Sequence, residues 1–139
     1  MPAALAYRYD GSEAAFVFGL RPGAYDTASL IEFLTDFHAH FAGEKVTLLW
    51  DGLPAHRSNE MTAWVARERR WLVVERLPAY APELNPVELL WGNVKSVELA
   101  NLCPETIEEA RAAAEAGLER AGGSYQLCFA FLGHTGLPL

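Results

Sequence analysis

The sequence has little of what marks a secreted or membrane protein. Its two cysteines, Cys103 and Cys128, are too few and too widely separated for a disulfide framework or a zinc site. The N-terminus has no basic region followed by an apolar stretch, so it does not resemble a signal peptide. No apolar run reaches the length of a membrane span. We therefore expect a cytoplasmic protein with reduced thiols and no membrane contact.

Positive charge is also scarce. The chain has 11 Lys and Arg residues against 18 Asp and Glu, which gives a net charge of −7. Free-standing nucleic-acid-binding domains are usually basic, so this class is disfavoured. The charge does not exclude an enzyme that acts on nucleic acid, because acids can be concentrated at a metal site. A length of 139 residues and a hydrophobic fraction of 51% suffice for one domain with a real core.

Apolar runs and helical spacings alternate along the chain. Strands that alternate with helices indicate a mixed α/β sheet with helices on its faces. The two inner strands are nearly continuous apolar runs, which are typical of strands buried on both faces, and the helix between them makes a parallel βαβ unit. The expected elements are a hairpin (3–9 and 14–20), a helix (27–41), a strand (45–50), a helix (58–69), a strand (71–77), helices over 86–100 and 104–122, and an apolar tail that packs on the domain.

Helical spacing also predicts which side chains face the core. His38 and His40 are two positions apart on their helix and point to different faces, so we expect them to face solvent rather than to bind a metal. The predicted buried stripes are Val87, Leu90, Trp91, Val94 and Val97 on one helix, and Ile107, Ala110, Ala114 and Leu118 on the next.

Two acids are expected at one edge of the sheet. Asp51 directly follows the strand over 45–50, and Glu88 lies just beyond the strand over 71–77. The carboxyl ends of parallel strands share an edge, and open α/β sheets bind their ligands there. Two such carboxylates are suited to Mg²⁺, which takes a few oxygen ligands and keeps room for water and phosphate.

A structural interpretation of the same acids stays open. Asp51 before Gly52 is typical of a turn. Asn85, Pro86 and Glu88 fit the N-cap, N1 and N3 positions of a helix, so Glu88 could reach back to its own cap. Spacing alone favours this capping role for Glu88.

One face of the same helix favours a functional role. Glu88, Gly92 and Lys95 share a face that is separate from the apolar stripe. It offers an acid, a position without a side chain and a lysine, so a phosphate backbone could run along it. The simpler interpretation of Lys95 is an ordinary solvated lysine.

Two stretches carry a family resemblance. "LPAYAPELNPVELLWGNVK" (77–95) is similar to the signature around the last catalytic acid of mariner-type transposases and their bacterial insertion-sequence relatives. "LLWDGLPAHRS" (48–58) resembles the segment of the second catalytic Asp, with Gly52 in place of the usual Asn. The positions that match the first signature are Leu77, Pro78, Tyr80, Pro82, Leu84, Asn85, Pro86, Glu88, Trp91 and Lys95, and those that match the second are Asp51 and His56.

The resemblance implies a ribonuclease-H-like fold, in which a five-stranded mixed sheet is flanked by helices and a triad of acids holds two Mg²⁺ or Mn²⁺ ions. It implies hydrolysis at transposon ends and then attack of the freed 3′-hydroxyl on target DNA. Asp51 and Glu88 would be the second and third acids and the metal ligands. The resemblance places His56, Arg57 and Lys95 on DNA, and it gives Asn85, Pro86 and Trp91 the support of Glu88.

The family's first acid, and the first strand that carries it, have no counterpart here. The hairpin begins at Ala3, and Asp10 lies in its turn, where it cannot substitute. We therefore expect residues 1–139 to be a partial catalytic domain that lacks its first sheet strand and binds metal weakly. It would self-associate or join the missing N-terminal segment. The alternatives are a second reading frame completed elsewhere, a decayed non-catalytic remnant that keeps protein or DNA contacts, and a cut-down piece.

Overall fold

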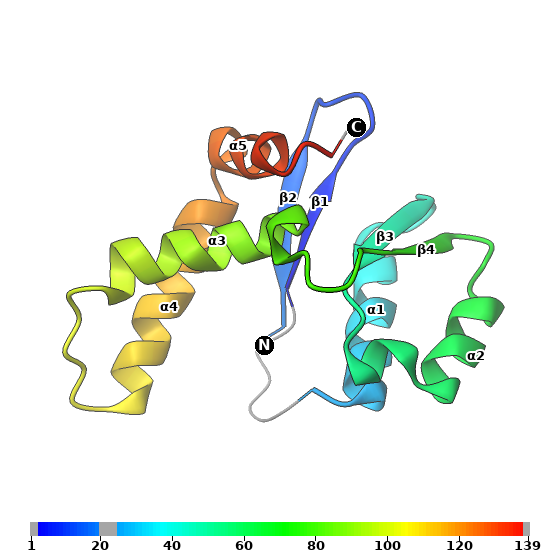
Figure 1. Ribbon diagram of the computed structural model, residues 1–139, viewed down its shortest axis with the longest axis horizontal. Coiled ribbons are helices and arrows are strands. Elements are labelled where there is room, and N and C mark those ends of the chain that lie inside the picture. Colours follow the sequence, from blue (N-terminus) through cyan, green and yellow to red (C-terminus); the bar gives the residue numbers. More distant parts are fainter. Residues whose placement is uncertain (1–2, 20–24, 138–139) are drawn as a thin grey trace. The chain divides into compact units, whose positions relative to one another are not determined.

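The structure is a computed structural model that describes residues 3–19 and 25–137 (Figure 1). The chain divides into two compact units. Unit 1 is built mainly of Phe18–Asn85, and unit 2 of Ala4–Val17 together with the chain from Pro86 onward. Within the described residues the strands form two separate two-stranded sheets, one of β1 and β2 and one of β3 and β4.

Unit 1 contains the predicted βαβ unit. Strands β3 and β4 are parallel, and Val46 pairs with Leu72 and Trp50 with Arg76 at the two ends of the register. This pairing confirms the parallel arrangement. The elements of unit 1 are α1 (Thr27–His40), β3 (Val46–Trp50), the 3₁₀ turn η1 (Pro54–Arg57), α2 (Asn59–Arg67), β4 (Leu72–Arg76) and the 3₁₀ turn η2 (Pro82–Leu84).

Side-chain caps start both helices of unit 1. The Asp26 carboxylate accepts a hydrogen bond from the Ser29 amide (2.8 Å), and the Ser58 hydroxyl accepts one from the Met61 amide (3.1 Å). Of the two residues that could cap α1, Asp26 and Thr27, the structure uses Asp26. The apolar sides of both helices and of the strands form one core cluster, which consists of Leu30, Leu34, Trp50, Met61, Trp64, Trp71 and Leu72.

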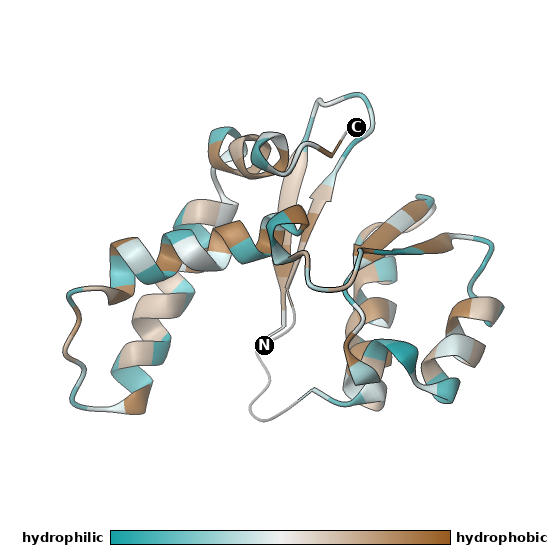
Figure 2. Cartoon of the chain, in the orientation of Figure 1, coloured by the Kyte–Doolittle hydropathy of each residue, from teal (hydrophilic) through white to brown (hydrophobic). Residues whose placement is uncertain are grey.

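The prediction that both inner strands are buried on both faces is wrong. Side chains alternate along β3 between the core and the surface, and Leu49 on β3 and Val73 on β4 are 48% and 54% exposed. Figure 2 shows both strands as largely hydrophobic, although only one face packs on the core cluster. Because apolar residues also occupy the exposed face, the sequence of these strands does not show the alternation between buried and exposed positions.

The solvent-facing prediction for the two histidines holds for one of them. His40 is exposed. His38 is half-buried, and its ring stacks on the Trp71 indole with the centroids 3.9 Å apart and the planes 4° from parallel. Spacing could not reveal this contact, because Trp71 lies outside the helix.

Unit 2 is a hairpin with a group of helices. In the hairpin turn the Arg8 amide donates to the Glu13 carbonyl (3.0 Å), and Gly11 takes a positive φ of 72°, as expected of an Asp-Gly turn. The elements are β1 (Ala3–Tyr7), β2 (Ala14–Phe18), α3 (Pro86–Val94), the π-helical turn η3 (Lys95–Leu99), α4 (Ile107–Gly122) and α5 (Tyr125–Thr135).

The core of unit 2 lies where α3, α4 and α5 pack together. Its fully buried side chains are Leu90 and Val94 on α3, Leu118 and Ala121 on α4, and Cys128 on α5. The Tyr7 hydroxyl donates to the Cys128 carbonyl (2.7 Å), which fastens the hairpin to α5. Burial raises the pKa of Tyr7 above its usual range. The apolar tail thus packs on the domain as predicted, and it does so as a helix.

Of the predicted apolar stripes, only Leu90, Val94 and Leu118 are buried. Val97 is 58% exposed and Ile107 is 82% exposed, and the half-buried members are Val87, Trp91, Ala110 and Ala114. The π turn after Val94 explains Val97, because widening a helix rotates the following residues away from the stripe. Ile107 is exposed because α4 begins there, after the Thr106 cap, rather than at 104.

Candidate active site

Asp51 stands at the carboxyl end of β3, as predicted. Its Oδ1 atom accepts a hydrogen bond from the Leu53 amide (3.2 Å), and the side chain is 46% exposed. This bond is the turn contact that the structural interpretation expected. The carboxylate is still open to solvent, so the turn and a ligand role are compatible.

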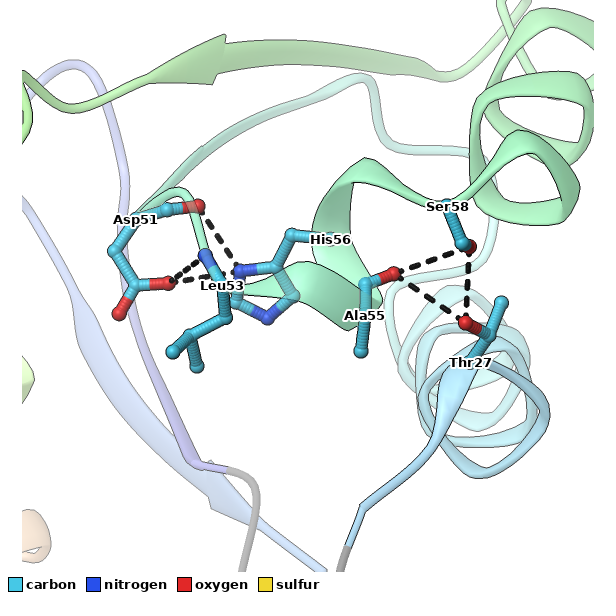
Figure 3. Close-up of polar contacts among 6 residues, drawn as sticks. All are labelled: Thr27, Asp51, Leu53, Ala55, His56 and Ser58. Atoms are coloured by element: carbon cyan, nitrogen blue, oxygen red, sulfur yellow. Dashed lines mark hydrogen bonds and ion pairs between the residues drawn. The ribbon is translucent and has the colours of Figure 1, made fainter.

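Among the predicted site residues, His56 is the one that contacts Asp51 (Figure 3). Its Nδ1 atom lies 2.9 Å from Asp51 Oδ1 and 3.0 Å from the Asp51 main-chain oxygen. Its ring stacks on the Trp50 indole, with centroids 4.2 Å apart and planes 4° from parallel, and the side chain is only 12% exposed. Nδ1 and one ring face are thus engaged inside unit 1, and the contact of His56 with DNA stays a prediction.

The turn that carries His56 is held from its far side by hydroxyl groups. The Thr27 hydroxyl donates to the Ser58 hydroxyl (2.9 Å), and the Ser58 hydroxyl donates to the Ala55 carbonyl (3.3 Å) (Figure 3). Ser58 also caps α2. One serine therefore joins η1, α1 and α2 next to the Asp51 turn.

Glu88 lies in the first turn of α3, which begins at Pro86 as predicted. Its side chain is exposed, and its carboxylate makes no hydrogen bond within the described part of the chain. The capping box that spacing favoured for Glu88 is therefore wrong. Gly92 and Lys95 are exposed as well, and a common face for the three stays a prediction because Lys95 begins the π-helical turn η3.

The other predicted residues divide between the two units. Asp51, His56 and the exposed Arg57 belong to unit 1, and Glu88, the half-buried Trp91 and Lys95 belong to unit 2. The structure brings His56 to Asp51. The proximity of the Asp51 and Glu88 carboxylates stays a prediction.

The described residues contain no group of three or more His, Cys, Asp or Glu side chains that could hold a metal ion. Asp51 and Glu88 offer the oxygen donors that Mg²⁺ and Mn²⁺ take, but together they supply only part of a cage. The donor chemistry thus fits these ions, and the set of ligands is incomplete.

Two further features of unit 1 were not predicted from the sequence. Tyr80, in the proline-rich stretch, has a positive φ of 59° and a fully exposed side chain, a conformation that costs a non-glycine residue energy. Arg67, Arg69 and Arg70 are exposed and line a shallow depression at the end of α2. The run of arginines in the sequence could have indicated the exposed arginine cluster, whereas no residue pattern indicates the positive φ of Tyr80.

The family model of the DDE superfamily endonucleases matches residues 3–110, a span that includes both Asp51 and Glu88. The match covers well over half of the chain, and the chain therefore belongs to the DDE superfamily endonuclease family. Metal-dependent cleavage is generic to this family. No curated protein sequence matches the chain significantly.

Solved structures of the Mos1 transposase catalytic domain are similar. The structure with raltegravir and Mg has a TM-score of 0.50 at 13% identity and covers 99% of this chain and 83% of that one. This likeness shows a ribonuclease-H-like fold, as expected from the sequence. The structure with raltegravir and Mn has a TM-score of 0.49 at 14% identity and covers 89% of this chain and 70% of that one. The crystal structure of the Mos1 mariner transposase catalytic domain has a TM-score of 0.48 at 17% identity and covers 87% of this chain and 68% of that one.

Within the described residues no helix is both long and apolar enough to cross a bilayer.

Proposed function

We propose that the chain supplies the second and third acids of a mariner-type DNA strand-transfer site. Asp51 and Glu88 are these acids. The observation that carries the proposal is the position of Asp51, whose half-exposed carboxylate follows the last residue of β3 inside the span that matches the family. Glu88 adds an exposed carboxylate that makes no hydrogen bond with described residues.

The residues would divide the work as follows. Asp51 and Glu88 would each offer carboxylate oxygen to Mg²⁺ or Mn²⁺. The bound ions would activate the attacking oxygen and stabilise the leaving one during cleavage of transposon ends and joining to target DNA. Arg57 and Lys95 would contact phosphates, which positions DNA without reading its sequence. Asn85 and Pro86 would fix the start of α3 beneath Glu88.

A third acid must complete the site. Two carboxylates leave the charge of two divalent ions poorly balanced, and Mg²⁺ parts with water reluctantly. We propose that residues 1–139 alone neither cut nor join DNA, and that a segment with the first strand and its Asp completes them, in the same chain or in trans. We propose that the protein acts in the reducing cytoplasm, because both of its cysteines are free and one of them is exposed.

The test is complementation. Residues 1–139 are mixed with, or fused to, a segment that carries a first strand ending in Asp, and cleavage of transposon-end DNA is measured with Mg²⁺ and with Mn²⁺. We expect activity only in the completed protein, and its loss in Asp51→Asn and in Glu88→Gln. Glu83→Gln, an exposed acid of η2 in the same stretch, is the matched control and should stay active.

A non-catalytic module that keeps only protein or DNA contacts is the second candidate. It predicts that no completed protein cuts DNA, while DNA binding is unchanged by Asp51→Asn. Activity of residues 1–139 alone that Glu88→Gln abolishes would contradict both candidates.

A further inference from the structure

We infer that His56 is a positioning residue for Asp51: it holds the carboxylate by an Nδ1–H hydrogen bond so that one oxygen points to solvent in a fixed direction. The inference rests on the proposed function only for the ligand that this oxygen would take. The hydrogen bond itself can be tested without metal or DNA.

The contacts of Nδ1 determine the tautomer of the ring. Both of its neighbours, Asp51 Oδ1 at 2.9 Å and the Asp51 carbonyl oxygen at 3.0 Å, are acceptors. An Nδ1 without hydrogen would face two oxygen lone pairs, which is repulsive. Nδ1 therefore carries the hydrogen and shares it between the two oxygens of the same residue.

The Asp51 carboxylate is consequently held at one oxygen. Oδ1 accepts from both His56 Nδ1 and the Leu53 amide. Oδ2 makes no hydrogen bond with described residues, and Figure 3 shows it pointing away from the imidazole. A carboxylate with one fixed and one open oxygen is ready to act as a monodentate ligand without losing much side-chain freedom.

The ring of His56 is itself fixed by its neighbours. Trp50 belongs to the core cluster and stacks on the imidazole, so the strand that ends in Asp51 also provides the platform for its hydrogen-bond donor. The His56 amide donates to the Leu53 carbonyl (2.9 Å), which closes the turn. An imidazole so placed has little freedom to serve as a mobile contact to DNA.

The first experiment reads the tautomer in the unmodified 139-residue chain. Nitrogen-15 NMR of the labelled histidines distinguishes the Nδ1–H from the Nε2–H form of a neutral ring. We expect the Nδ1–H form for His56, and we expect Asp51→Asn to shift its nitrogen signals. A neutral Nε2–H ring would overturn the inference.

The second experiment separates the donor from the ring. The Asn amide nitrogen can take the place of Nδ1, so His56→Asn keeps a donor without the imidazole. His56→Phe keeps a ring that can stack on Trp50 but has no donor. Melting temperatures of both variants show that the fold is retained, and the carboxyl carbon-13 signal of Asp51 reports its hydrogen bonding.

Metal binding is followed by the broadening of Asp51 signals with added Mn²⁺. We expect His56→Asn to stay within about three-fold of the parent affinity and His56→Phe to lose about ten-fold, the lower end for partners of metal ligands. Equal affinities and equal Asp51 signals in the two folded variants would overturn the positioning role. If Mn²⁺ does not bind the parent either, the metal site of the proposed function fails, and the tautomer and the Asp51 carbon signal still decide the role of His56.

Discussion

Unit 1 contains two stacked tryptophan–histidine pairs whose indoles differ in a single hydrogen bond. Trp50 stacks on His56 and Trp71 on His38, both at 4° between planes, and both indoles are 8% exposed. Trp71 Nε1 donates to Glu68 Oε2 at 2.7 Å. Trp50 Nε1 is buried and has no hydrogen-bond partner among the described residues. The two indoles therefore make an internally matched comparison.

We predict that Trp71→Phe destabilises the protein more than Trp50→Phe does. Both changes shorten a stacked ring in the same core, but only the first removes a hydrogen bond and leaves a carboxylate without its donor. The difference should be about 1.5 kcal/mol, the usual contribution of a hydrogen bond to a charged group. Urea unfolding followed by circular dichroism measures it. Equal losses would show that the Glu68 bond contributes nothing net.

For single residues, the sequence predicts the position of a side chain in an element better than it predicts the side chain's hydrogen bonds. Asp51 was found because strand ends and turns leave a residue pattern. The bond from His56 to Asp51 was not, because the spacing of five residues becomes meaningful only once η1 curls the chain back. The predicted capping role of Glu88 is wrong although the capping sequence is present, because the Glu88 carboxylate makes no hydrogen bond with the described part of the chain.

Helix α3 is anchored by aliphatic side chains rather than by its tryptophan. Leu90 and Val94 are completely buried against α4 and α5, while Trp91 is half-buried. We predict that Leu90→Ala costs about 2–5 kcal/mol of unfolding free energy, because it leaves a cavity in the core of unit 2. Val97→Ala, at a 58% exposed position of the following turn, should change stability by no more than about 0.5 kcal/mol. Chemical denaturation of both variants checks the pair, and comparable losses would contradict the assigned helix face.

An ion pair joins η3 to α4. Arg120 donates to both carboxylate oxygens of Glu98 and, through Nη2, to the Asn93 side chain at 2.7 Å. The hydrogen bond from Arg120 lowers the pKa of Glu98 below its ordinary value. Since the folded state then binds the proton less readily than the unfolded chain, the pair stabilises the fold above the unfolded pKa, near 4.5. This contribution is lost as the pH falls through the lowered folded pKa.

We therefore predict a pH-dependent effect of Glu98→Gln. At pH 7 the variant should melt at a lower temperature than the parent, and the gap should close as the pH falls through the lowered folded pKa of Glu98. Glu75→Gln is the control, because Glu75 is exposed on β4, away from any helix end, and has no ion pair within the described residues. It should show no gap at either pH. A gap for Glu98→Gln that widens in acid would refute the assignment.

Sequence periodicity succeeded for elements with a clear pattern and failed where the pattern was uniform. The parallel pair and the helix starts near Thr27 and Ser58 followed from apolar runs and helical spacing. Helix α5 was expected only as a packed tail, because "YQLCFAFLGHT" is apolar almost throughout and has no helical period. The division into two units leaves no sequence signal either, since no linker separates them.

The whole molecule presents an apolar sheet face. Leu49 on β3 and Val73 on β4 are exposed on the same face in diagonal positions, and within the described residues this sheet has only two strands. Unpaired strand edges next to exposed apolar side chains favour pairing between chains. We propose that the chain associates with itself through this sheet.

The prediction is that the sedimentation coefficient rises with concentration for the parent and much less for Leu49→Lys. The new lysine would lie opposite Glu75 in the register, so the substitution suits the strand pair while charging its face. Val97→Lys, which charges an exposed apolar position in unit 2, is the control and should associate like the parent. Association that is equal in all three would place the contact elsewhere.

The two thiols of unit 2 differ in exposure, so the rate at which the buried one is modified reports how often unit 2 opens. Cys103 is exposed in the loop before α4, whereas Cys128 is buried and its Sγ lies 3.7 Å from the carbonyls of Ala121 and Gly122. Burial raises the pKa of the Cys128 thiol, so its reactive thiolate is scarce as well as shielded. An alkylating reagent should modify Cys103 at once and Cys128 only at the rate at which unit 2 opens. Three of the four tryptophans lie in unit 1, so fluorescence recorded beside the alkylation would tell whether one half of the chain can open while the other stays folded.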